Sequence, residues 1–389
     1  MRVAVLGTGM IGNMIVCELA KADSILEIIA VDTSQSNLDR CLKDANQSKV
    51  LGRIATLDDW DTLVSIMKEV DIAVACLPHF LSLPAVKAAI EGGCHLIDLV
   101  GSKYLEKAEL HNEAKEKGVL IVPGAGVAPG ITNFLAARGI ELLDEAEEAV
   151  MICGGIPRHP LPPLWYQVVF RLESVMGLYT RPALAAENGH LVELPPLSGK
   201  ETLHFPNPVG ECEAVITDAH SVAFTLKNKV KRLYEKTVRY KGHWDKMAVL
   251  AELGFLDEDE VIIEGMKVCP RKLSMAILEP KMKGESNEDI TVLRVTVKGK
   301  KDGKSVKLEW EMVDLYDNEK NITSMARTTG YPAVILTEWL ANGTLKQSGV
   351  VSIEELIIGD YFDPFMEELK QRNIHIKFEK SYSYENVSI

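Results

Sequence analysis

The feature that most constrains this chain is a glycine-rich loop between a strand-like and a helix-like segment at its N-terminus. Residues 2–6 read RVAVL, which is typical of a buried strand, and Ile11, Ile15 and Leu19 recur at helical spacing. Glycines in this context permit a tight turn and close approach of a pyrophosphate, while the helix offers free N–H groups to the phosphates. The pattern favours a dinucleotide site over a glycine turn without a ligand. The predicted loop residues are Gly7, Thr8, Gly9, Met10, Ile11 and Gly12.

An acidic residue follows this loop at the expected distance. The next strand-like segment, residues 26–31, ends at Asp32, twenty residues after Gly12. A carboxylate at that position accepts hydrogen bonds from the ribose hydroxyls of a dinucleotide. No Arg or Lys stands directly beside Asp32 to meet a 2′-phosphate. We therefore expect NAD as the cofactor, with NADP less favoured.

Strand-like and helix-like segments continue to alternate through the first third of the chain. Residues 71–76, 95–99 and 119–122 are predicted strands, with helices over 83–91 and 103–117 between them. This rhythm predicts a doubly wound parallel sheet, whose ligands lie beyond the carboxyl ends of the strands. Leu77 and Pro78 are equally compatible with a plain loop, and Asp98 with a helix cap or turn residue. The further residues expected at the cofactor are Leu77, Pro78, Asp98, Val100 and Val127.

Composition excludes several classes of protein. The 389 residues carry a net charge of −13, which argues against nucleic-acid binding and against an anionic membrane surface. Seven cysteines are scattered singly and no zinc-type motif occurs, so we expect reduced thiols, a cytoplasmic location and no metal site. Glycines interrupt the apolar N-terminal run, which we therefore do not interpret as a signal peptide, and no segment is predicted to span a bilayer.

The remaining two thirds follow a different pattern. Residues 123–130 read PGAGVAPG, a candidate domain boundary. Apolar and polar residues alternate over 293–298 and 306–312 around a turn at 301–304, which predicts an antiparallel hairpin with one wet face. The fold class is thus α/β, an N-terminal Rossmann doubly wound parallel sheet plus a second α+β domain with a largely antiparallel sheet. The exposed face of the sheet in the second domain predicts a homodimer or homotetramer.

The expected boundaries follow from these patterns. The dinucleotide-binding domain covers residues 1–127, and a helix within 328–343 packs back on it. Residues 128–327 and 344–389 form the domain for substrate binding and oligomerisation.

Several segments together resemble the saccharopine dehydrogenase-like family, and most closely its lysine 6-dehydrogenase members. They are the Gly126–Gly130 loop, GGIP at 154–157, VFRLES at 169–174 with Tyr179, KTVRYKGH at 236–243 and MARTT at 325–329. The resemblance covers nearly the whole chain. It implies NAD-dependent oxidation of the side-chain amine of L-lysine to 2-aminoadipate 6-semialdehyde, which cyclises to piperideine-6-carboxylate, with release of ammonia.

That chemistry makes demands on side chains. Hydride leaves a carbon that bears nitrogen only when the amine is neutral, and a free lysine amine has a pKa of about 10.4. The site therefore needs a proton acceptor, for which His243, Glu173 and Lys236 are candidates, and an Arg fork for the substrate carboxylate, for which we choose Arg239. Each has a competing structural interpretation, as a surface or capping residue. The other substrate-site candidates are Tyr179, Asp218, His220 and Thr328, the last of which is favoured more as a helix cap.

Two functions compete with lysine oxidation. The segment Thr217–Ser221 and the loop Leu77–His79 depart from the lysine pattern, so the substrate can differ in length or charge. A saccharopine dehydrogenase or another dehydrogenase of carboxyalkyl amines would need a second carboxylate site, for which Arg171, Arg181 and Arg271 are available. A non-catalytic NAD-sensing protein is the alternative outside enzymology.

Overall fold

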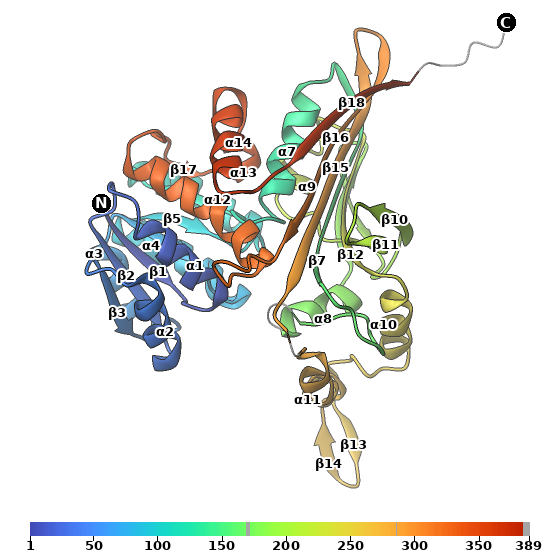
Figure 1. Ribbon diagram of the computed structural model, residues 1–389, viewed down its shortest axis with the longest axis horizontal. Coiled ribbons are helices and arrows are strands. Elements are labelled where there is room, and N and C mark those ends of the chain that lie inside the picture. Colours follow the sequence, from blue (N-terminus) through green and yellow to red (C-terminus); the bar gives the residue numbers. More distant parts are fainter. Residues whose placement is uncertain (169–171, 285, 384–389) are drawn as a thin grey trace, which may run out of the picture. The chain divides into compact units, whose positions relative to one another are not determined.

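The computed structural model describes residues 1–168, 172–284 and 286–383, which form two compact units. Unit 1 comprises Met1–Arg138, His220–Val222 and Ala326–Ile374, and unit 2 comprises Gly139–Ala219, Ala223–Met325 and the chain from His375 onward. Unit 1 contains a parallel sheet and unit 2 a mixed, mostly antiparallel sheet (Figure 1). The predicted fold class is confirmed.

Unit 1 is a doubly wound sheet with strand order β3-β2-β1-β4-β5-β6-β17, all parallel. The order reverses between β1 and β4, the switch point at which dinucleotides bind in such sheets. The strands are β1 (Arg2–Leu6), β2 (Glu27–Asp32), β3 (Val50–Ile54), β4 (Ile72–Ala75), β5 (His95–Asp98), β6 (Leu120–Pro123) and β17 (Gly349–Val350). The helices that begin in its N-terminal part are α1 (Met10–Leu19), α2 (Gln35–Ala45), α3 (Trp60–Glu69), α4 (His79–Gly92), α5 (Tyr104–Ala108), α6 (His111–Glu116) and α7 (Ile131–Glu141).

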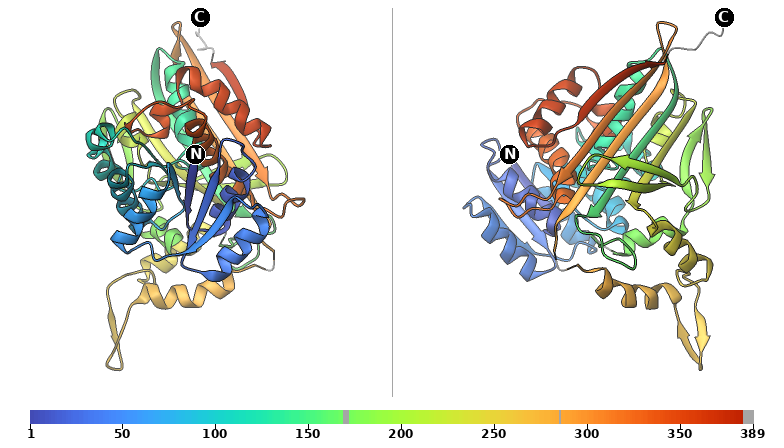
Figure 2. Two further views of the ribbon diagram at one scale, coloured as in Figure 1. Left: turned by 90° about the vertical axis from the view of Figure 1, so that its left-hand side faces the viewer. Right: turned by 45° about the vertical axis from the view of Figure 1, so that its right-hand side comes forward.

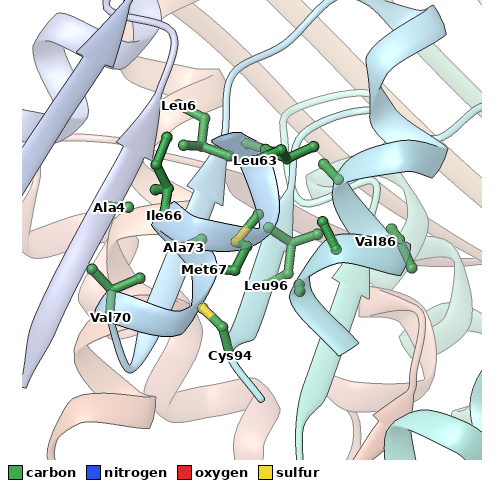
Figure 3. Packing of buried hydrophobic residues seen from close by; sticks show 14 of the residues in the cluster. Ala4, Leu6, Leu63, Ile66, Met67, Val70, Ala73, Val86, Cys94 and Leu96 are labelled. Atoms are coloured by element: carbon green, nitrogen blue, oxygen red, sulfur yellow. The ribbon is translucent and has the colours of Figure 1, made fainter. Parts of the chain in front are cut away.

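The core of unit 1 lies between this sheet and the helices that cover it. Figure 3 shows Leu6 and Ala73 of the sheet facing Ile66 and Met67 of α3, with Val86 of α4 beside them. All five side chains are at most 1% exposed. Their burial fixes the strands whose carboxyl ends carry the glycine loop.

The C-terminal part of unit 1 corrects two expectations. Residues 344–374, assigned to the second domain from the sequence, lie in unit 1, because β17 pairs with β6 and extends the parallel sheet. The helix expected within 328–343 is α12 (Ser324–Ala341), which begins four residues before that range. α13 (Ile353–Leu356), a 3-10 turn at Gly359–Tyr361 and α14 (Phe362–Gln371) complete the unit.

Unit 2 is built on a nine-stranded sheet in which β12 runs parallel to β7 and the other pairs are antiparallel (Figure 2). The main path runs β10-β11-β12-β7-β15-β16-β18, and β8 and β9 attach at β12. Its strands are β7 (Glu145–Pro157), β8 (Ala183–Glu187), β9 (His190–Leu194), β10 (Glu201–Phe205), β11 (Gly210–Thr217), β12 (Arg232–Tyr240), β15 (Asp289–Lys301), β16 (Lys304–Leu315) and β18 (Lys377–Ser383). The helices are α8 (Leu172–Thr180), α9 (Val222–Thr225), α10 (His243–Glu252) and α11 (Pro270–Met282), and a separate hairpin joins β13 (Val261–Ile263) to β14 (Met266–Val268).

The predicted hairpin is β15–β16, and it turns at Asp302 and Gly303. Both residues have positive φ angles, 51° and 72°, as a two-residue hairpin turn of matching twist requires. Within the described residues, no helix has the length and apolarity needed to cross a membrane. The same residues contain no group of three or more potential metal-binding side chains.

Candidate functional site

The glycine loop in unit 1 is tightly packed at two of its glycines and has open space at the third. A Cβ atom on Gly7, whose φ is +91°, would lie 2.6 Å from the Cys76 carbonyl oxygen, and one on Gly12 would lie 1.8 Å from that of Gly7. A Cβ on Gly9 would meet no atom within 4 Å. The loop therefore holds β1, β4 and α1 together while it leaves space at Gly9, which fits a dinucleotide phosphate.

Asp32 is tied to this loop. Its Oδ2 accepts hydrogen bonds from the backbone N–H of Thr8 (2.7 Å) and from the Thr8 hydroxyl (3.0 Å), and its Oδ1 accepts from the Ser34 N–H (2.8 Å). Burial alone would raise the pKa of Asp32, but these donors together lower it below its ordinary value. Asp32 is therefore an ionised carboxylate at the end of β2, where a ribose would be bound.

A cation that the sequence argument missed lies close by. Arg40, an exposed residue of α2, donates to the Thr8 carbonyl oxygen at 3.3 Å and to the Asn37 side chain at 3.4 Å. Arg40 is not adjacent to Asp32 in sequence, since it lies about two helical turns further on. Helical spacing from Asn37 is the signal that would have identified it.

The carboxyl ends of β4 and β5 carry the other residues expected at the cofactor. Leu77 and Pro78 are half-buried, and Pro78 precedes the first turn of α4. Asp98 and Lys107 form an ion pair of 2.8 Å in which neither side chain is exposed. Asp98 also accepts from the Val100 N–H, and Lys107 donates to the Val100 carbonyl oxygen, so the pair fixes the backbone of Val100 on both sides. Asp98 thus acts as a turn residue, which was the alternative interpretation.

The remaining loop residues differ in exposure. Thr8 is fully buried and Met10 is 44% exposed at the start of α1. Ile11 is half-buried, and Val127 is buried in the loop that precedes α7.

In unit 2, a buried arginine lies among aromatic rings. Arg239 of β12 is 2% exposed, and its guanidinium carbon lies 4.3 Å from the ring centre of Tyr166 and 5.7 Å from that of Trp244. Its Nη1 donates to the Val238 carbonyl oxygen, whereas its Nε has no partner among the described residues. No acidic side chain in the described part of the chain pairs with it. A buried cation without a counter-ion is costly, so this cluster is suited to an anion.

Two further predicted residues join this cluster. His243 is fully buried at the start of α10; its Nδ1 lies 2.8 Å from the Leu164 carbonyl oxygen and its Nε2 2.9 Å from the Tyr179 hydroxyl. Because a carbonyl only accepts, Nδ1 carries the proton and Tyr179 donates to Nε2. Burial and then the charge of Arg239 lower the pKa of His243 to about 3. Both ring nitrogens are engaged, so the geometry gives His243 the role of orienting Tyr179 rather than the proton transfer expected from sequence.

A glycine of the GGIP segment brings the neighbouring strand close to Arg239. A Cβ atom on Gly154 of β7 would lie 2.6 Å from the Val238 carbonyl oxygen, the atom that accepts from Arg239. On the same face of β12 as Arg239 lies Glu235, which is 5% exposed and which the sequence argument missed. The alternation of polar residues along KTVRY would have indicated it only if the strand had been known to be buried on both faces.

Other predicted site residues lie elsewhere. Lys236 is on the face of β12 opposite to Arg239 and forms an ion pair of 2.6 Å with Glu201, so it does not belong to the cluster around Arg239. Glu173 belongs to α8, but its side chain lies outside the described part, as does Arg171. Thr328 is the fifth residue of α12 and fully buried, so it does not cap the helix. That role belongs to Asp289, which accepts from the N–H groups of Ser324 and Met325.

The remaining polar candidates are divided between the units. Asp218 lies in unit 2 at the end of β11, whereas His220 lies in unit 1, where its ring is close to Gly101. Of the arginines considered for a second carboxylate site, Arg181 is exposed and Arg271 pairs with Glu258. The structure therefore brings together Arg239, Tyr179 and His243.

Comparison with known proteins identifies relatives along the whole chain. A family model described as saccharopine dehydrogenase NADP binding domain matches residues 3–122, and one described as saccharopine dehydrogenase C-terminal domain matches residues 126–374. A carboxyaminopropylagmatine dehydrogenase from Synechocystis sp. is 21% identical, over 96% of this chain and 96% of the relative. An L-glutamate-forming saccharopine dehydrogenase from Saccharomyces cerevisiae is 22% identical, over 96% of this chain and 98% of the relative.

A solved structure shares the fold. Apo saccharopine dehydrogenase (L-Glu forming) from Saccharomyces cerevisiae superposes with a TM-score of 0.81, at 20% sequence identity, covering 98% of this chain and 99% of that one.

Proposed function

The chain belongs to the saccharopine dehydrogenase family of oxidoreductases, whose Rossmann-type unit serves a nicotinamide cofactor, and from this premise we propose that it oxidises a carbon–nitrogen bond of an amino-acid substrate. The observation that carries the proposal is Arg239, buried without an acidic partner within the described residues. A substrate carboxylate would provide the missing anion and accept two parallel hydrogen bonds from the guanidinium.

The aromatic residues around Arg239 prepare it for this role. Tyr166, Tyr179 and Trp244 exclude water, which strengthens the attraction between guanidinium and carboxylate. The Tyr166 hydroxyl is buried beside Arg239, which places it to donate to the same carboxylate. His243 holds the Tyr179 ring in place through its Nε2. This unit therefore supplies binding and orientation, and the nicotinamide, when bound, accepts the hydride.

We favour a secondary amine that carries a carboxylate as the substrate, with L-lysine as the competing candidate. The relatives that cover the whole chain are named for saccharopine and carboxyaminopropylagmatine, which supports the first choice. Lysine oxidation, expected from the sequence resemblance, requires the same Arg239 contact. In both reactions the amine must lose its proton before hydride can leave its carbon.

The choice between NAD and NADP rests on two opposing charges. Asp32 is an ionised carboxylate that favours ribose hydroxyls and repels a 2′-phosphate, and on this ground we propose NAD. Arg40 and the description of the matching family model as an NADP binding domain argue for NADP.

We also propose that the chain forms a homo-oligomer. Phe378 and Tyr382 on the edge strand β18 are each 49% exposed, and Ile262 of the β13–β14 hairpin is 74% exposed. Exposed apolar side chains on a sheet edge are typical of subunit contacts. Sedimentation velocity would give the number of copies.

The experiment that tests the proposed reaction measures nicotinamide reduction with purified protein. Saccharopine, carboxyaminopropylagmatine and L-lysine are each supplied with NAD and with NADP. We expect reduction with at least one of them and loss of that activity in Arg239→Met. The proposal fails if nucleotide binds but no amine is oxidised, the result that a non-catalytic sensor would give.

A further inference from the structure

A buried guanidinium and a buried carboxyl lie on the same face of β12. Arg239 is 2% exposed and Glu235 is 5% exposed, and because side chains alternate along a strand, residues four apart share a face. Oε2 of Glu235 has no hydrogen-bond partner within the described residues, and the two side chains do not pair with each other. The Arg239 end of the face also carries Glu213 of β11, which is 6% exposed, pairs in register with Arg239 and accepts a hydrogen bond from the Gly242 N–H. Among the described residues, neither carboxyl forms an ion pair with the guanidinium.

Polar side chains connect these two positions. Thr237 lies between them on the same face, and its hydroxyl is 3.0 Å from that of Thr217, the residue opposite Glu235 on β11. Cys153 of β7 pairs in register with Thr237. Burial raises the pKa of its thiol; the charge of Glu235 raises this pKa further and that of Arg239 lowers it. The face therefore presents a polar row with Arg239 and Glu213 at one end and Glu235 at the other.

The Cα atoms of Glu235 and Arg239 are separated by about 13 Å, the rise of four strand residues, and the guanidinium is held at the Val238 carbonyl oxygen. A ligand with a carboxylate at one end and a positive nitrogen well along its chain would pair with both residues.

We propose that Glu235 binds a positively charged nitrogen in the distal part of the substrate whose carboxylate Arg239 holds. The inference rests on the proposed function, since it takes the Arg239 contact as given. Glu235 is then a specificity-determining residue that selects amines with a cation far from the carboxylate over uncharged molecules of the same length.

The electrostatics of Glu235 agree with this role. Burial, and then the negative charge of Asp218, raise the pKa of Glu235 well above its ordinary value. The surroundings of Glu235 thus favour its neutral carboxyl. A cationic nitrogen stabilises the ionised form when it arrives, so ion pairing accompanies binding.

The test uses simple probes of graded length. Isothermal titration calorimetry measures binding of 6-aminohexanoate and 8-aminooctanoate, and of hexanoate and octanoate, to the full chain saturated with nucleotide. We expect wild type to bind an amino acid of the series more tightly than the matched alkanoate by roughly tenfold to a hundredfold, the contribution of a charged hydrogen bond. Glu235→Gln should abolish that difference and leave alkanoate binding unchanged. Glu193→Gln, on exposed β9, is the matched control and should behave as wild type.

The outcomes separate the two proposals. Equal binding of amino acids and alkanoates by wild type, or an undiminished preference in Glu235→Gln, overturns the role of Glu235 while the Arg239 contact stands. No binding of any carboxylate, or binding unaffected by Arg239→Met, contradicts the proposed function itself. If Glu235→Gln does not fold, Glu235→Asp, whose shorter side chain withdraws from the nitrogen, should weaken amino-acid binding alone.

Discussion

Asp32 at the end of β2 holds Thr8 of the glycine loop by two hydrogen bonds, from the backbone N–H at 2.7 Å and from the hydroxyl at 3.0 Å. The residue that would bind a ribose thus also fixes the loop that would bind the phosphates. Arg40 approaches the same Thr8 from α2, through its carbonyl oxygen. The proposed preference between NAD and NADP therefore rests on a carboxylate and a guanidinium that both contact Thr8.

Substitutions at these two positions should change the cofactors in opposite ways. Asp32→Asn weakens acceptance from ribose hydroxyls and removes the charge that repels a 2′-phosphate, so NAD affinity should fall about tenfold while NADP affinity falls less or rises. Arg40→Ala should weaken NADP binding and leave NAD binding nearly unchanged. Nucleotide titrations followed by tryptophan fluorescence would measure both. Equal losses for the two nucleotides in both variants would contradict the assignment.

The glycines of the loop should have separable effects. Gly9 has a φ of −60° and open space around it, so Gly9→Ala should unfold at the same urea concentration as wild type but bind nucleotide more weakly. Gly12→Ala places a methyl group 1.8 Å from the Gly7 carbonyl oxygen, so the backbone must move and stability should fall by several kcal/mol. Urea unfolding together with nucleotide titration tests the contrast. A Gly9→Ala protein with unchanged nucleotide affinity would show that the dinucleotide does not approach this residue.

The ion pair between Asp98 and Lys107 should be essential to unit 1, since both side chains are completely buried. Lys107→Met leaves an unpaired carboxylate, and we expect a loss of about 3–5 kcal/mol in the free energy of unfolding. The double variant Lys107→Met/Asp98→Asn should recover part of that loss, because the charge is then gone. Lys115→Met, on the exposed side of α6, serves as the control. A single variant as stable as the control would rule out this account of the pair.

His243 should make stability depend on pH. Its pKa is lowered to about 3 in the folded protein, by burial first and by Arg239 second, whereas an unfolded histidine titrates near 6.5. Between about pH 6.5 and pH 3, the unfolded chain binds a proton at His243 and the folded chain does not. The free energy of unfolding therefore decreases as pH falls through this range.

The measurement compares wild type with His243→Gln at pH 7 and pH 5. Between these values wild type should lose about 2 kcal/mol more than the variant. Other groups titrate in the same range, among them Asp289, whose pKa burial raises to about 6, so the difference between the two proteins is the informative quantity. Parallel pH curves would mean that the folded protein binds a proton at His243 as readily as the unfolded chain does, which contradicts the lowered pKa.

The sequence predicted those features that depend on local pattern. The glycine loop, Asp32 and the β15–β16 turn each follow from residue types at fixed spacing, and the structure places them in the expected elements. β17 was not predicted, because a strand of two residues shows no periodicity. For the same reason, the assignment of residues 344–374 to the Rossmann unit was not predicted.

The candidate site was predictable only in part. Arg239 could be named from family resemblance, but its burial among Tyr166, Tyr179 and Trp244 depends on packing between segments distant in sequence. The same packing engages both nitrogens of His243, which no local pattern reveals. Glu235 was overlooked because a charged residue in a strand is usually exposed.

The central claim is that Arg239 holds the carboxylate of an amine that this chain oxidises. The most direct test is nicotinamide reduction with saccharopine, carboxyaminopropylagmatine and L-lysine in wild type, Arg239→Lys and Arg239→Met. We predict turnover of a secondary amine by wild type, a KM raised roughly tenfold or more in Arg239→Lys because the bidentate contact is lost, and no measurable activity in Arg239→Met. Turnover in Arg239→Met with an unchanged KM would contradict the account.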